Sequence, residues 1–324
     1  MVKIHDFLMQ VIEFSALLMA TLILVGVVTI VVLYIIDVTQ SQQAIRRNYP
    51  VIGRFRYLFE HLGVFFRQYF FAMDREELPF NRAQRGWIAR AAKDIDHTIA
   101  FGSTKPIHTP GDILFLNSAF PKLDEETQLS AKTPLCFGRG YARDVYETHS
   151  VFHISAMSYG ALSAPAIQAL SMGAAKAGIL LNTGEGGLAP FHLKGQCDLV
   201  YQIGTAKYGV RNTDGTLSDD KLQEIAAHTS VKMFEIKLSQ GAKPGKGGIL
   251  PAEKVTAVIA STRGIPMGQD SLSPNRHIDI SSVDDLLSMI HRVREVTGKP
   301  VGIKFVLGQP EWLDDLCQAI QTRG

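Results

Sequence analysis

Residues 14–36 form an apolar run that contains no charged side chain. A helix rises ~1.5 Å per residue, so about 20 such residues cross the ~30 Å hydrocarbon core of a bilayer. The helix of a globular core would show polar positions every three or four residues, and a cleaved signal peptide has a shorter apolar core with small residues at its cleavage site. This run instead ends in the bulky residues Tyr34, Ile35 and Ile36. It therefore predicts a retained transmembrane helix that follows a short tail, residues 1–13.

Basic residues are distributed unequally around the apolar run. Lys3 is the one Lys or Arg before it. Five arginines follow it in the sequence: Arg46, Arg47, Arg54, Arg56 and Arg67. By the positive-inside rule, this asymmetry predicts a single-pass membrane protein with its bulk in the cytoplasm. A reducing compartment also suits the three cysteines, whose spacing matches neither a disulfide framework nor a metal site: Cys136, Cys197 and Cys317.

Residues 37–150 are expected to connect this helix to a later domain. The segment 51–73 is rich in aromatic side chains interleaved with arginines, and two interpretations fit it: a helix on the membrane surface, or a helix packed on the later domain. Such mixtures also occur in single-stranded nucleic-acid sites, but a net charge of +2 without a long basic run argues against nucleic acid. Asn81 is expected to cap a helix. The region before residue 150 contains no catalytic constellation.

The period of the apolar pattern changes at residue 151, where extended segments begin to alternate with helical patterns. Repeated strand–helix units build a parallel sheet with right-handed crossovers. An open doubly wound sheet and an eight-fold barrel both fit, but no GxGxxG motif follows the first strand, which weighs against a dinucleotide fold. We therefore expect an α/β fold of the (β/α)8 TIM-barrel type over residues 151–324, incomplete at about six of its eight units. The expected strands are 151–157, 179–184, 199–204, 231–239, an irregular segment near 270, and 301–307.

In a β/α barrel, the chemical groups collect where the parallel strands end. Here the predicted strands end in glycine-rich loops, which allow a flat ligand to approach the backbone. The amide side chains of Asn182, Gln202 and Gln240 can hydrogen bond to ring nitrogens and carbonyls. Lys237 and Lys304 follow apolar stretches of strand, and burying an unpaired cation costs several kcal/mol. Each lysine is therefore expected to reach an anion or the mouth of the barrel.

Three motifs in combination resemble a known family. They are Met-Ser-Tyr-Gly-Ala-Leu-Ser at 157–163, Asn-Thr-Gly-Glu-Gly-Gly at 182–187 and Gln-Gly-Ala-Lys-Pro-Gly-Lys-Gly-Gly at 240–248. With the membrane-anchored front, the chain resembles the stand-alone FMN-binding glutamate synthase family over about residues 151–307. The resemblance implies an FMN-dependent oxidoreductase acting on the CH–NH2 group, in which 2-iminoglutarate, formed from 2-oxoglutarate and ammonia, is reduced to L-glutamate. The electron donor is not implied.

The resemblance also assigns residues to the two sides of the site. Glu185 would handle the imine proton, and Lys304 would lie near flavin N1. The residues implied on the cofactor side are Ala156, Met157, Ser158, Tyr159, Asn182, Thr183, Gln202 and Lys304. Those implied on the substrate side are Glu185, Lys237, Gln240 and Lys243.

The family's barrel continues past the sixth unit, through a phosphate-binding loop and a three-cysteine iron–sulfur segment. This sequence stops at Gly324, so a C-terminally truncated barrel that binds FMN poorly is expected, with any iron–sulfur cluster in the missing part. Two alternatives remain open. The chain is a different FMN-barrel oxidoreductase acting on another small acid or amine, or it is a non-catalytic, membrane-anchored scaffold.

Overall fold

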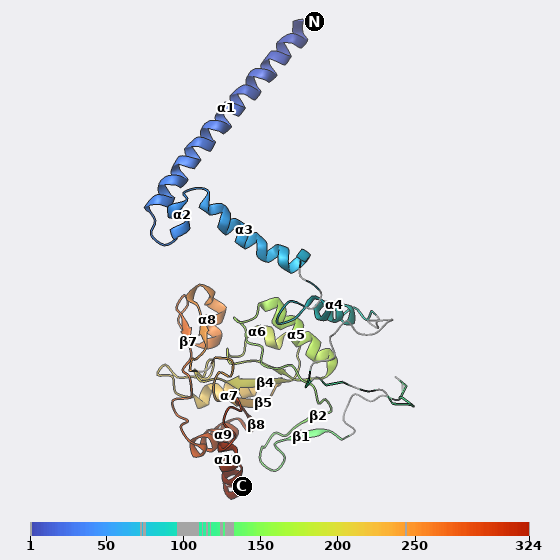
Figure 1. The fold of residues 1–324 in the computed structure, drawn as a ribbon. Coiled ribbons are helices and arrows are strands. Elements are labelled where there is room, and N and C mark those ends of the chain that lie inside the picture. Colours follow the sequence, from blue (N-terminus) through green and yellow to red (C-terminus); the bar gives the residue numbers. More distant parts are fainter. Residues whose placement is uncertain are drawn as a thin grey trace. The chain divides into compact units, whose positions relative to one another are not determined.

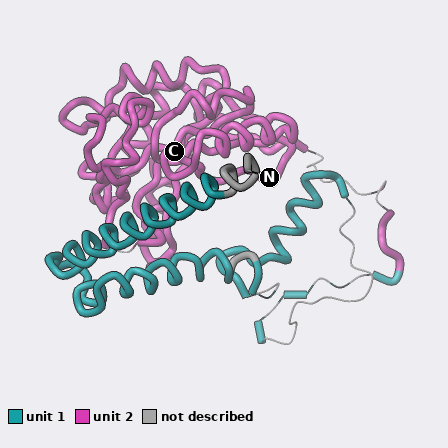
Figure 2. The backbone as a smooth tube through the Cα atoms, turned by 90° about the horizontal axis from the view of Figure 1, so that it is seen from above, with its two compact units in different colours: residues 1–119 teal, residues 120–324 magenta. Residues whose placement is uncertain are grey.

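The chain falls into two compact units, residues 1–119 and residues 120–324, which Figures 1 and 2 display and which are described here one at a time. The predicted domain limits after residues 13, 36 and 150 stay predictions. The structure is a computed structural model that describes residues 2–71, 73, 76–95, 110–111, 113–114, 116, 118–123, 126, 133–243 and 245–323.

Helices make up the described part of the first unit. The long helix α1 covers Val2–Thr39, and within Met9–Thr39 an 18-residue window has a mean hydropathy of 2.9 and contains no buried residue. Length and composition thus make it a candidate membrane span, although a signal sequence near the N-terminus meets the same criterion. Three further α-helices and one π-helix follow: α2 at Ala44–Asn48, α3 at Gly53–Phe66, the π-helix η1 at Arg67–Phe71 and α4 at Arg82–Ala91.

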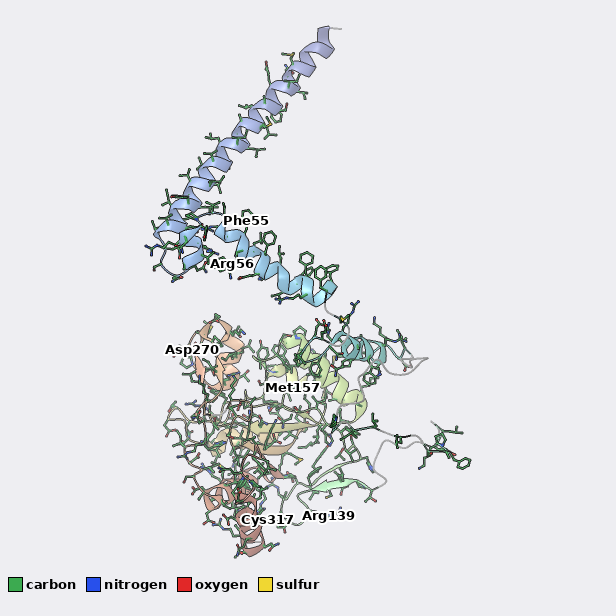
Figure 3. The ribbon with its side chains drawn as sticks, in the orientation of Figure 1. Phe55, Arg56, Arg139, Met157, Asp270 and Cys317 are labelled. Carbon is green, nitrogen blue, oxygen red and sulfur yellow. The ribbon has the colours of Figure 1, made fainter. Side chains whose placement is uncertain are left out.

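The predicted cap at Asn81 is confirmed. Its side chain accepts a hydrogen bond from the Gln84 backbone at 3.0 Å, and the Gln84 side chain accepts one from the Asn81 backbone at 3.0 Å. This reciprocal pair satisfies two of the backbone donors that every helix N-terminus leaves open. The aromatic segment predicted at 51–73 is helical along α3 and η1, and Figure 3 labels two of its side chains, Phe55 and Arg56.

A parallel sheet forms the centre of the second unit. Its strands are β3 (Leu181–Asn182), β4 (Leu199–Ile203), β5 (Val231–Lys237) and β8 (Val301–Lys304), in that spatial order. The first predicted strand continues this sheet, since Ile154 forms a parallel bridge with Leu181. A separate antiparallel pair, β1 (Leu135–Phe137) with β2 (Tyr146–Thr148), precedes it. The helices are α5 (Ala164–Ala177), α6 (Pro190–Leu193), α7 (Asp219–Ala227), η3 (Ala252–Lys254), α8 (Ala257–Arg263), α9 (Val283–Thr297) and α10 (Trp312–Arg323).

The strand expected near residue 270 is not a unit of the parallel sheet, so the count of about six units was wrong. That segment, β7 (Ser271–Leu272), pairs antiparallel with β6 (Ile249–Leu250), and the parallel neighbour of β5 is β8. The physical reason is that β7 finds a pairing strand, β6, within its own segment of the chain. The excursion between β5 and α9 folds on itself around its own small apolar cluster: Leu250, Val255, Ile259 and Ala260. Among the described residues, the parallel arrangement therefore comprises the bridge at residue 154 and four strands, and no closed barrel is formed.

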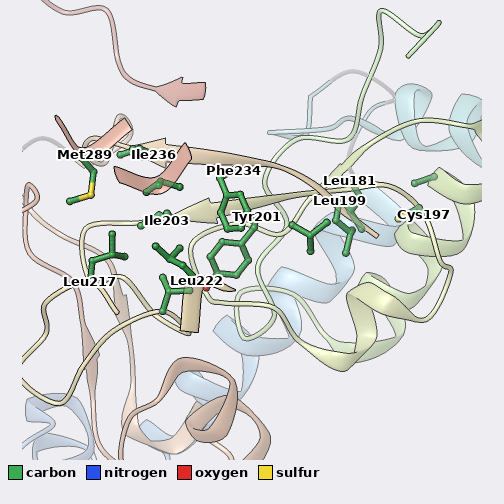
Figure 4. Packing of buried hydrophobic residues seen from close by; sticks show 14 residues of the cluster. Leu181, Cys197, Leu199, Tyr201, Ile203, Leu217, Leu222, Phe234, Ile236 and Met289 are labelled. Carbon is green, nitrogen blue, oxygen red and sulfur yellow. The ribbon is translucent and has the colours of Figure 1, made fainter. Parts of the chain in front are cut away.

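One face of the parallel sheet carries the hydrophobic core. Tyr201 on β4 and Phe234 on β5 are fully buried with ring centroids 5.6 Å apart (Figure 4). Leu222 of α7 and Val293 of α9 pack against the same cluster, which explains why these helices stay on that face. Because side chains alternate along a strand, burying every second residue directs the others to the opposite face. That opposite face carries the candidate site.

Candidate active site

Strand register aligns polar side chains on the face opposite the core. Gln202 of β4 lies beside Glu235 of β5, which lies beside Gly302 of β8. Two residues further along, Lys237 of β5 lies beside Lys304 of β8. The site therefore has two levels, a lower one around Glu235 and an upper one at the carboxyl ends of the strands.

Glu235 organises the lower level by accepting hydrogen bonds from two amides. Asn182 Nδ2 donates to Glu235 Oε1 at 2.8 Å, and Gln202 Nε2 donates to the same oxygen at 2.6 Å. Asn182 Oδ1 in turn accepts from the Gly184 backbone at 2.9 Å. Gln202 is 1% exposed, yet its Oε1 has no partner among the described residues. An unpaired buried acceptor costs about 1–3 kcal/mol, so this oxygen suits an N–H donor from a ligand.

Three of the four predicted substrate residues meet at the upper level. Gln240 Nε2 donates to both carboxylate oxygens of Glu185, at 2.6 and 2.8 Å. Lys237 Nζ donates to Gln240 Oε1 at 2.8 Å and lies 3.3 Å from Glu185 Oε1. The Lys237 and Glu185 side chains are 16% and 23% exposed, so the pair is shielded but still reachable. The Gln240 amide thus bridges an acid and a base.

Two glycines allow the strand ends to come this close. A Cβ on Gly204, after β4, would lie 2.6 Å from the Cβ of Glu185. Gly184 has φ of 68°, and a Cβ there would lie 2.8 Å from the Ser158 backbone nitrogen. A side chain at either position would push the neighbouring loop away, because such distances lie below van der Waals contact. The loop after β3 therefore packs directly on the segment that follows the first predicted strand.

The predicted cofactor segment at 156–159 is fixed by its backbone. The Met157 nitrogen donates to the Asn182 carbonyl at 3.0 Å, as in a parallel ladder. His192 holds the Met157 carbonyl at 2.8 Å through Nε2, while its Nδ1 accepts from the Ala189 nitrogen at 3.1 Å. Nε2 must therefore carry the proton, and burial lowers the pKa of His192, which keeps the ring neutral. Ser158 and Tyr159 follow directly.

Thr183 and Lys304 have contrasting environments. The Thr183 hydroxyl is consumed inside the sheet, where it donates to the Gly184 carbonyl at 3.0 Å and accepts from the Gln202 nitrogen at 3.2 Å. Lys304 is exposed and has no ion-pair partner among the described residues. The expectation that a strand lysine reaches the open end of the sheet is therefore met by Lys304. Lys237 instead reaches an anion, Glu185.

The structure does not bring Lys243 to the other substrate residues. Its side chain is exposed in the loop after β5, and within the described chain no hydrogen bond or ion pair of its ammonium group is found. A role for Lys243 stays a prediction. The same holds for the implied roles of the other site residues, which the geometry brings together without assigning a ligand.

Glu235 and His277 are site residues that the sequence analysis missed. Glu235 had a readable signal, because a carboxylate two positions before Lys237 in an apolar strand must lie on the same face. His277 had none. It is 1% exposed, and its Nε2 contacts the Lys237 carbonyl at 2.9 Å from a loop far along the chain. Burial lowers the pKa of His277, and its Nδ1 has no partner among the described residues.

A pocket of about 480 Å³ opens near the end of β5 but lies on the other side of the strand. Leu238 and Trp312 contribute to its largely apolar wall. Leu238 follows Lys237 directly and packs against the core cluster, so alternation separates this pocket from the polar face. Among the site residues named above, His277 also lines this pocket, so the pocket borders the site through that ring but does not include its polar face. Among the described residues, no group of three His, Cys, Asp or Glu side chains is arranged to hold a metal ion.

The fold and the site together define an α/β protein with a polar site at the carboxyl ends of parallel strands, the usual position of such sites in α/β enzymes. Comparison of sequences narrows that class. A sequence model of the family described as "Conserved region in glutamate synthase" matches residues 120–318, which is more than half of the chain. The chain belongs to the glutamate synthase family.

Individual relatives agree with this family. The glutamate synthase large subunit-like protein YerD of Bacillus subtilis is 36% identical over 340 residues, covering 94% of this chain and 64% of the relative. The archaeal glutamate synthase (NADPH) of Archaeoglobus fulgidus is 44% identical over 160 residues, covering 49% of this chain and 28% of the relative. A glutamate synthase large subunit-like protein of Rhizobium meliloti is 32% identical over 234 residues. This chain thus spans less than two thirds of the length of these relatives.

Proposed function

We propose that this chain is an FMN-dependent oxidoreductase that forms L-glutamate by reducing 2-iminoglutarate. 2-Oxoglutarate and ammonia condense to the imine with loss of water, and the imine then takes up a hydride at carbon and a proton at nitrogen. The contact that carries the proposal is the linkage of Glu185, Gln240 and Lys237 above the Asn182–Glu235–Gln202 level. The names of the relatives support the same reaction class. The source of the electrons is left unassigned.

The residues present fit FMN as the cofactor. The unpartnered acceptor on buried Gln202 suits a flavin ring N–H, and Gly184 and Gly204 keep the neighbouring backbone free of side chains. The segment 156–159, Asn182 and Thr183 would line the ring. Exposed Lys304 would supply the cation near N1. When bound, FMN supplies the hydride.

The substrate side is proposed to recognise a dicarboxylate through lysine. Lys237 already neutralises one carboxylate, Glu185, and a substrate carboxylate competes for the same ammonium group. Glu185 would handle the proton of the imine nitrogen, and the Gln240 amide orients its carboxylate for this role. Lys243 would act as a further cation at the rim of the site.

We also propose the larger setting of this site. The parallel sheet would be part of an eight-stranded β/α barrel, with residues 151–324 as that domain and residues 37–150 as the connection. Residues 14–36 would cross the membrane once, and the arginines that follow them support a cytoplasmic position for the barrel. Any iron–sulfur cluster belongs to the wider family resemblance and finds no support in the spacing of the three cysteines.

The test measures L-glutamate formed by the purified full chain in detergent, supplied with excess chemically reduced FMN, 2-oxoglutarate and ammonium. The variant Glu185→Gln should lower the rate about 10²–10⁴-fold, the range lost with a general acid, while FMN titration is unchanged. The matched control, Glu253→Gln, alters an exposed glutamate away from the site and should keep the full rate.

Three outcomes would overturn the proposal. Equal glutamate formation by wild type and Glu185→Gln removes Glu185 from the chemistry. Reoxidation of the reduced flavin by other small keto acids or imines, but not by 2-oxoglutarate with ammonium, selects the alternative oxidoreductase. A cellular role that survives Lys304→Met selects the scaffold.

A further inference from the structure

The helix α3 and the π-helix after it carry an exposed stripe of large apolar side chains. On α3 its members recur at intervals of three and four residues, the spacing of one helical face: Phe55, Leu58, Phe59, Leu62 and Phe66. Phe59 is 66% exposed, and Phe71 of η1 is 73% exposed. Exposed apolar clusters of this size mark an interaction surface. We call these five α3 residues, with Phe70 and Phe71, the aromatic stripe.

Charged side chains lie on α3 beside the stripe. Arg56 and Glu60 form an i,i+4 ion pair at 2.9 Å, and both side chains are more than half exposed. Arg67, the first residue of η1 and about two helical turns after Glu60, donates to the Gly63 carbonyl at 3.2 Å. Figure 3 labels Phe55 of the stripe and its neighbour Arg56 on the same helix. Bulky apolar side chains on one face with arginines on the other are typical of helices that lie in a membrane interface.

A buried ion pair ties the start of α3 to the end of α1. Asp37 is fully buried and accepts from Arg54 Nη2 at 2.7 Å, from Arg54 Nε at 2.9 Å and from the Val51 nitrogen at 2.9 Å. Gly53, the first residue of α3, approaches the Ile45 carbonyl so closely that a Cβ would lie 2.9 Å from its oxygen. These contacts fix the first turn of α3 at the level of Asp37. Asp37 is the acidic residue that directly follows the apolar run 14–36.

That connection decides which partner covers the stripe. If residues 14–36 cross the bilayer, Asp37 and Arg54 lie at its boundary, because an ionised pair avoids the hydrocarbon. The first turn of α3 then starts at the headgroup layer, next to a helix that is itself in lipid. Arginines beside the stripe complement anionic headgroups. A bilayer surface is thus continuous with α1 and suits both faces of α3.

We propose that α3 and η1 lie along an anionic membrane surface, with the aromatic stripe in the interface and Arg56 and Arg67 among the headgroups. This inference rests on the proposed membrane span of residues 14–36. It gives the chain two attachments to the bilayer, one that crosses it and one that lies on it. The second attachment would limit how far the catalytic unit can move from the membrane.

The experiment uses tryptophan fluorescence in the full chain, reconstituted in vesicles of phosphatidylcholine with one quarter phosphatidylglycerol. Trp87 and Trp312 are first replaced by Phe, and single tryptophans are then introduced by Phe59→Trp in the stripe or by Val64→Trp. Val64 is a matched control, since it is 57% exposed but lies on the opposite side of α3. Leu24→Trp reports on α1 itself.

Lipids with brominated acyl chains should quench the tryptophan of Phe59→Trp at least about twofold more strongly than that of Val64→Trp, and shift its emission to the blue. Strong quenching for Leu24→Trp without quenching for Phe59→Trp overturns the inference but keeps the span. A blue-shifted, unquenched Phe59→Trp signal means that the second unit or another copy covers the stripe, which also overturns it. Absent quenching for Leu24→Trp rejects the span, and the inference with it.

Discussion

The two units of this chain use the same apolar residue types in opposite ways. In the second unit, Leu181, Phe234 and Val293 are fully buried in one core, and the helices α7 and α9 complete it. In the first unit, nearly all large apolar side chains of Met9–Thr39 are exposed. Water excludes both sets alike, so the second unit is stabilised by its own packing, whereas the first requires a partner that it does not contain.

Two buried polar side chains, one in each unit, differ in how completely their hydrogen bonds are satisfied. In the first unit, the fully buried Asp37 is satisfied completely by Arg54 and the Val51 backbone, which suits a structural clasp. In the second unit, buried Gln202 keeps an acceptor without a partner among the described residues, next to the carboxylate of Glu235. A structural group needs full satisfaction, whereas a binding site retains capacity for a ligand. The difference distinguishes the Asp37 contact from the Gln202 position, although Gln43 Oε1 and Arg46 Nε in the first unit also have no partner among the described residues.

The largest expected effect comes from charging α1. The double substitution Leu24→Arg with Val28→Arg should move the protein from the membrane fraction to the soluble or aggregated fraction, because each central arginine costs about 2.5–3.5 kcal/mol of insertion free energy. Alkaline extraction of membranes measures the partition. Gln10→Arg, which lies outside the apolar run, is the control and should stay in the membrane. Retention of the double variant in the bilayer would remove the contrast between the units.

The next effect is confined to the second unit. Phe234→Ala should lower the free energy of unfolding of that unit by about 3–5 kcal/mol, since it leaves a cavity against Tyr201 in the core. Urea unfolding followed by circular dichroism measures it, and membrane partition should not change. Ile249→Ala, at a position that is 57% exposed, should cost far less. Similar losses in both variants would show that the core is not organised around β5.

A smaller effect is expected at the lower level of the site. Glu235→Gln removes the charge that orients Asn182 and Gln202, and hydrogen bonds to charged groups are worth about 1.5–3 kcal/mol. FMN affinity should therefore fall roughly tenfold or more, measured by quenching of flavin fluorescence. Glu295→Gln, on the exposed surface of α9, supplies the comparison and should bind FMN as wild type does. An unchanged FMN affinity in Glu235→Gln would show that FMN does not bind at the lower level of the site.

The sequence allowed those parts of the fold to be predicted that depend on neighbours along the chain. The helices that end at Gly178 and Gly298 are examples, because both glycines adopt the left-handed conformation, with φ of 64° and 72°, that favours glycine at a helix end. The cap at Ser282, whose hydroxyl accepts a hydrogen bond from the Asp285 nitrogen at 3.1 Å, likewise depends on adjacent residues. The misplaced strand at β7 shows the limit. A strand of two residues is too short to show an alternating apolar pattern. Its pairing with β6 depends on packing within the segment between β5 and α9.

In the candidate site, residues at strand ends could be predicted from the sequence, whereas a residue brought in by a distant loop could not. Asn182, Glu185, Lys237 and Gln240 could be grouped because each follows or ends a predicted strand, and parallel strands end at one edge. His277 could not be predicted, since its contact with the Lys237 carbonyl joins residues 40 positions apart through an irregular loop. The periodic pattern of apolar residues does not indicate a contact between such distant positions.

The smallest expected effect is a pH dependence that belongs to the second unit. His192 is fully buried, and burial lowers its pKa from the ordinary 6.5, so the unfolded chain binds a proton that the folded chain does not. Stability is therefore complete above about pH 6.5 and falls as the pH drops below it, by at most about 1.4 kcal/mol per pH unit for one such group. Urea midpoints at neutral pH and at mildly acidic pH measure the slope of the free energy of unfolding against pH. His192→Gln should reduce it, leaving the shares due to His277 and His153, whose pKa values burial also lowers. His61→Gln, at an exposed position on α3, should leave the slope unchanged, and a slope that instead depended on His61 would assign the acid sensitivity to the first unit.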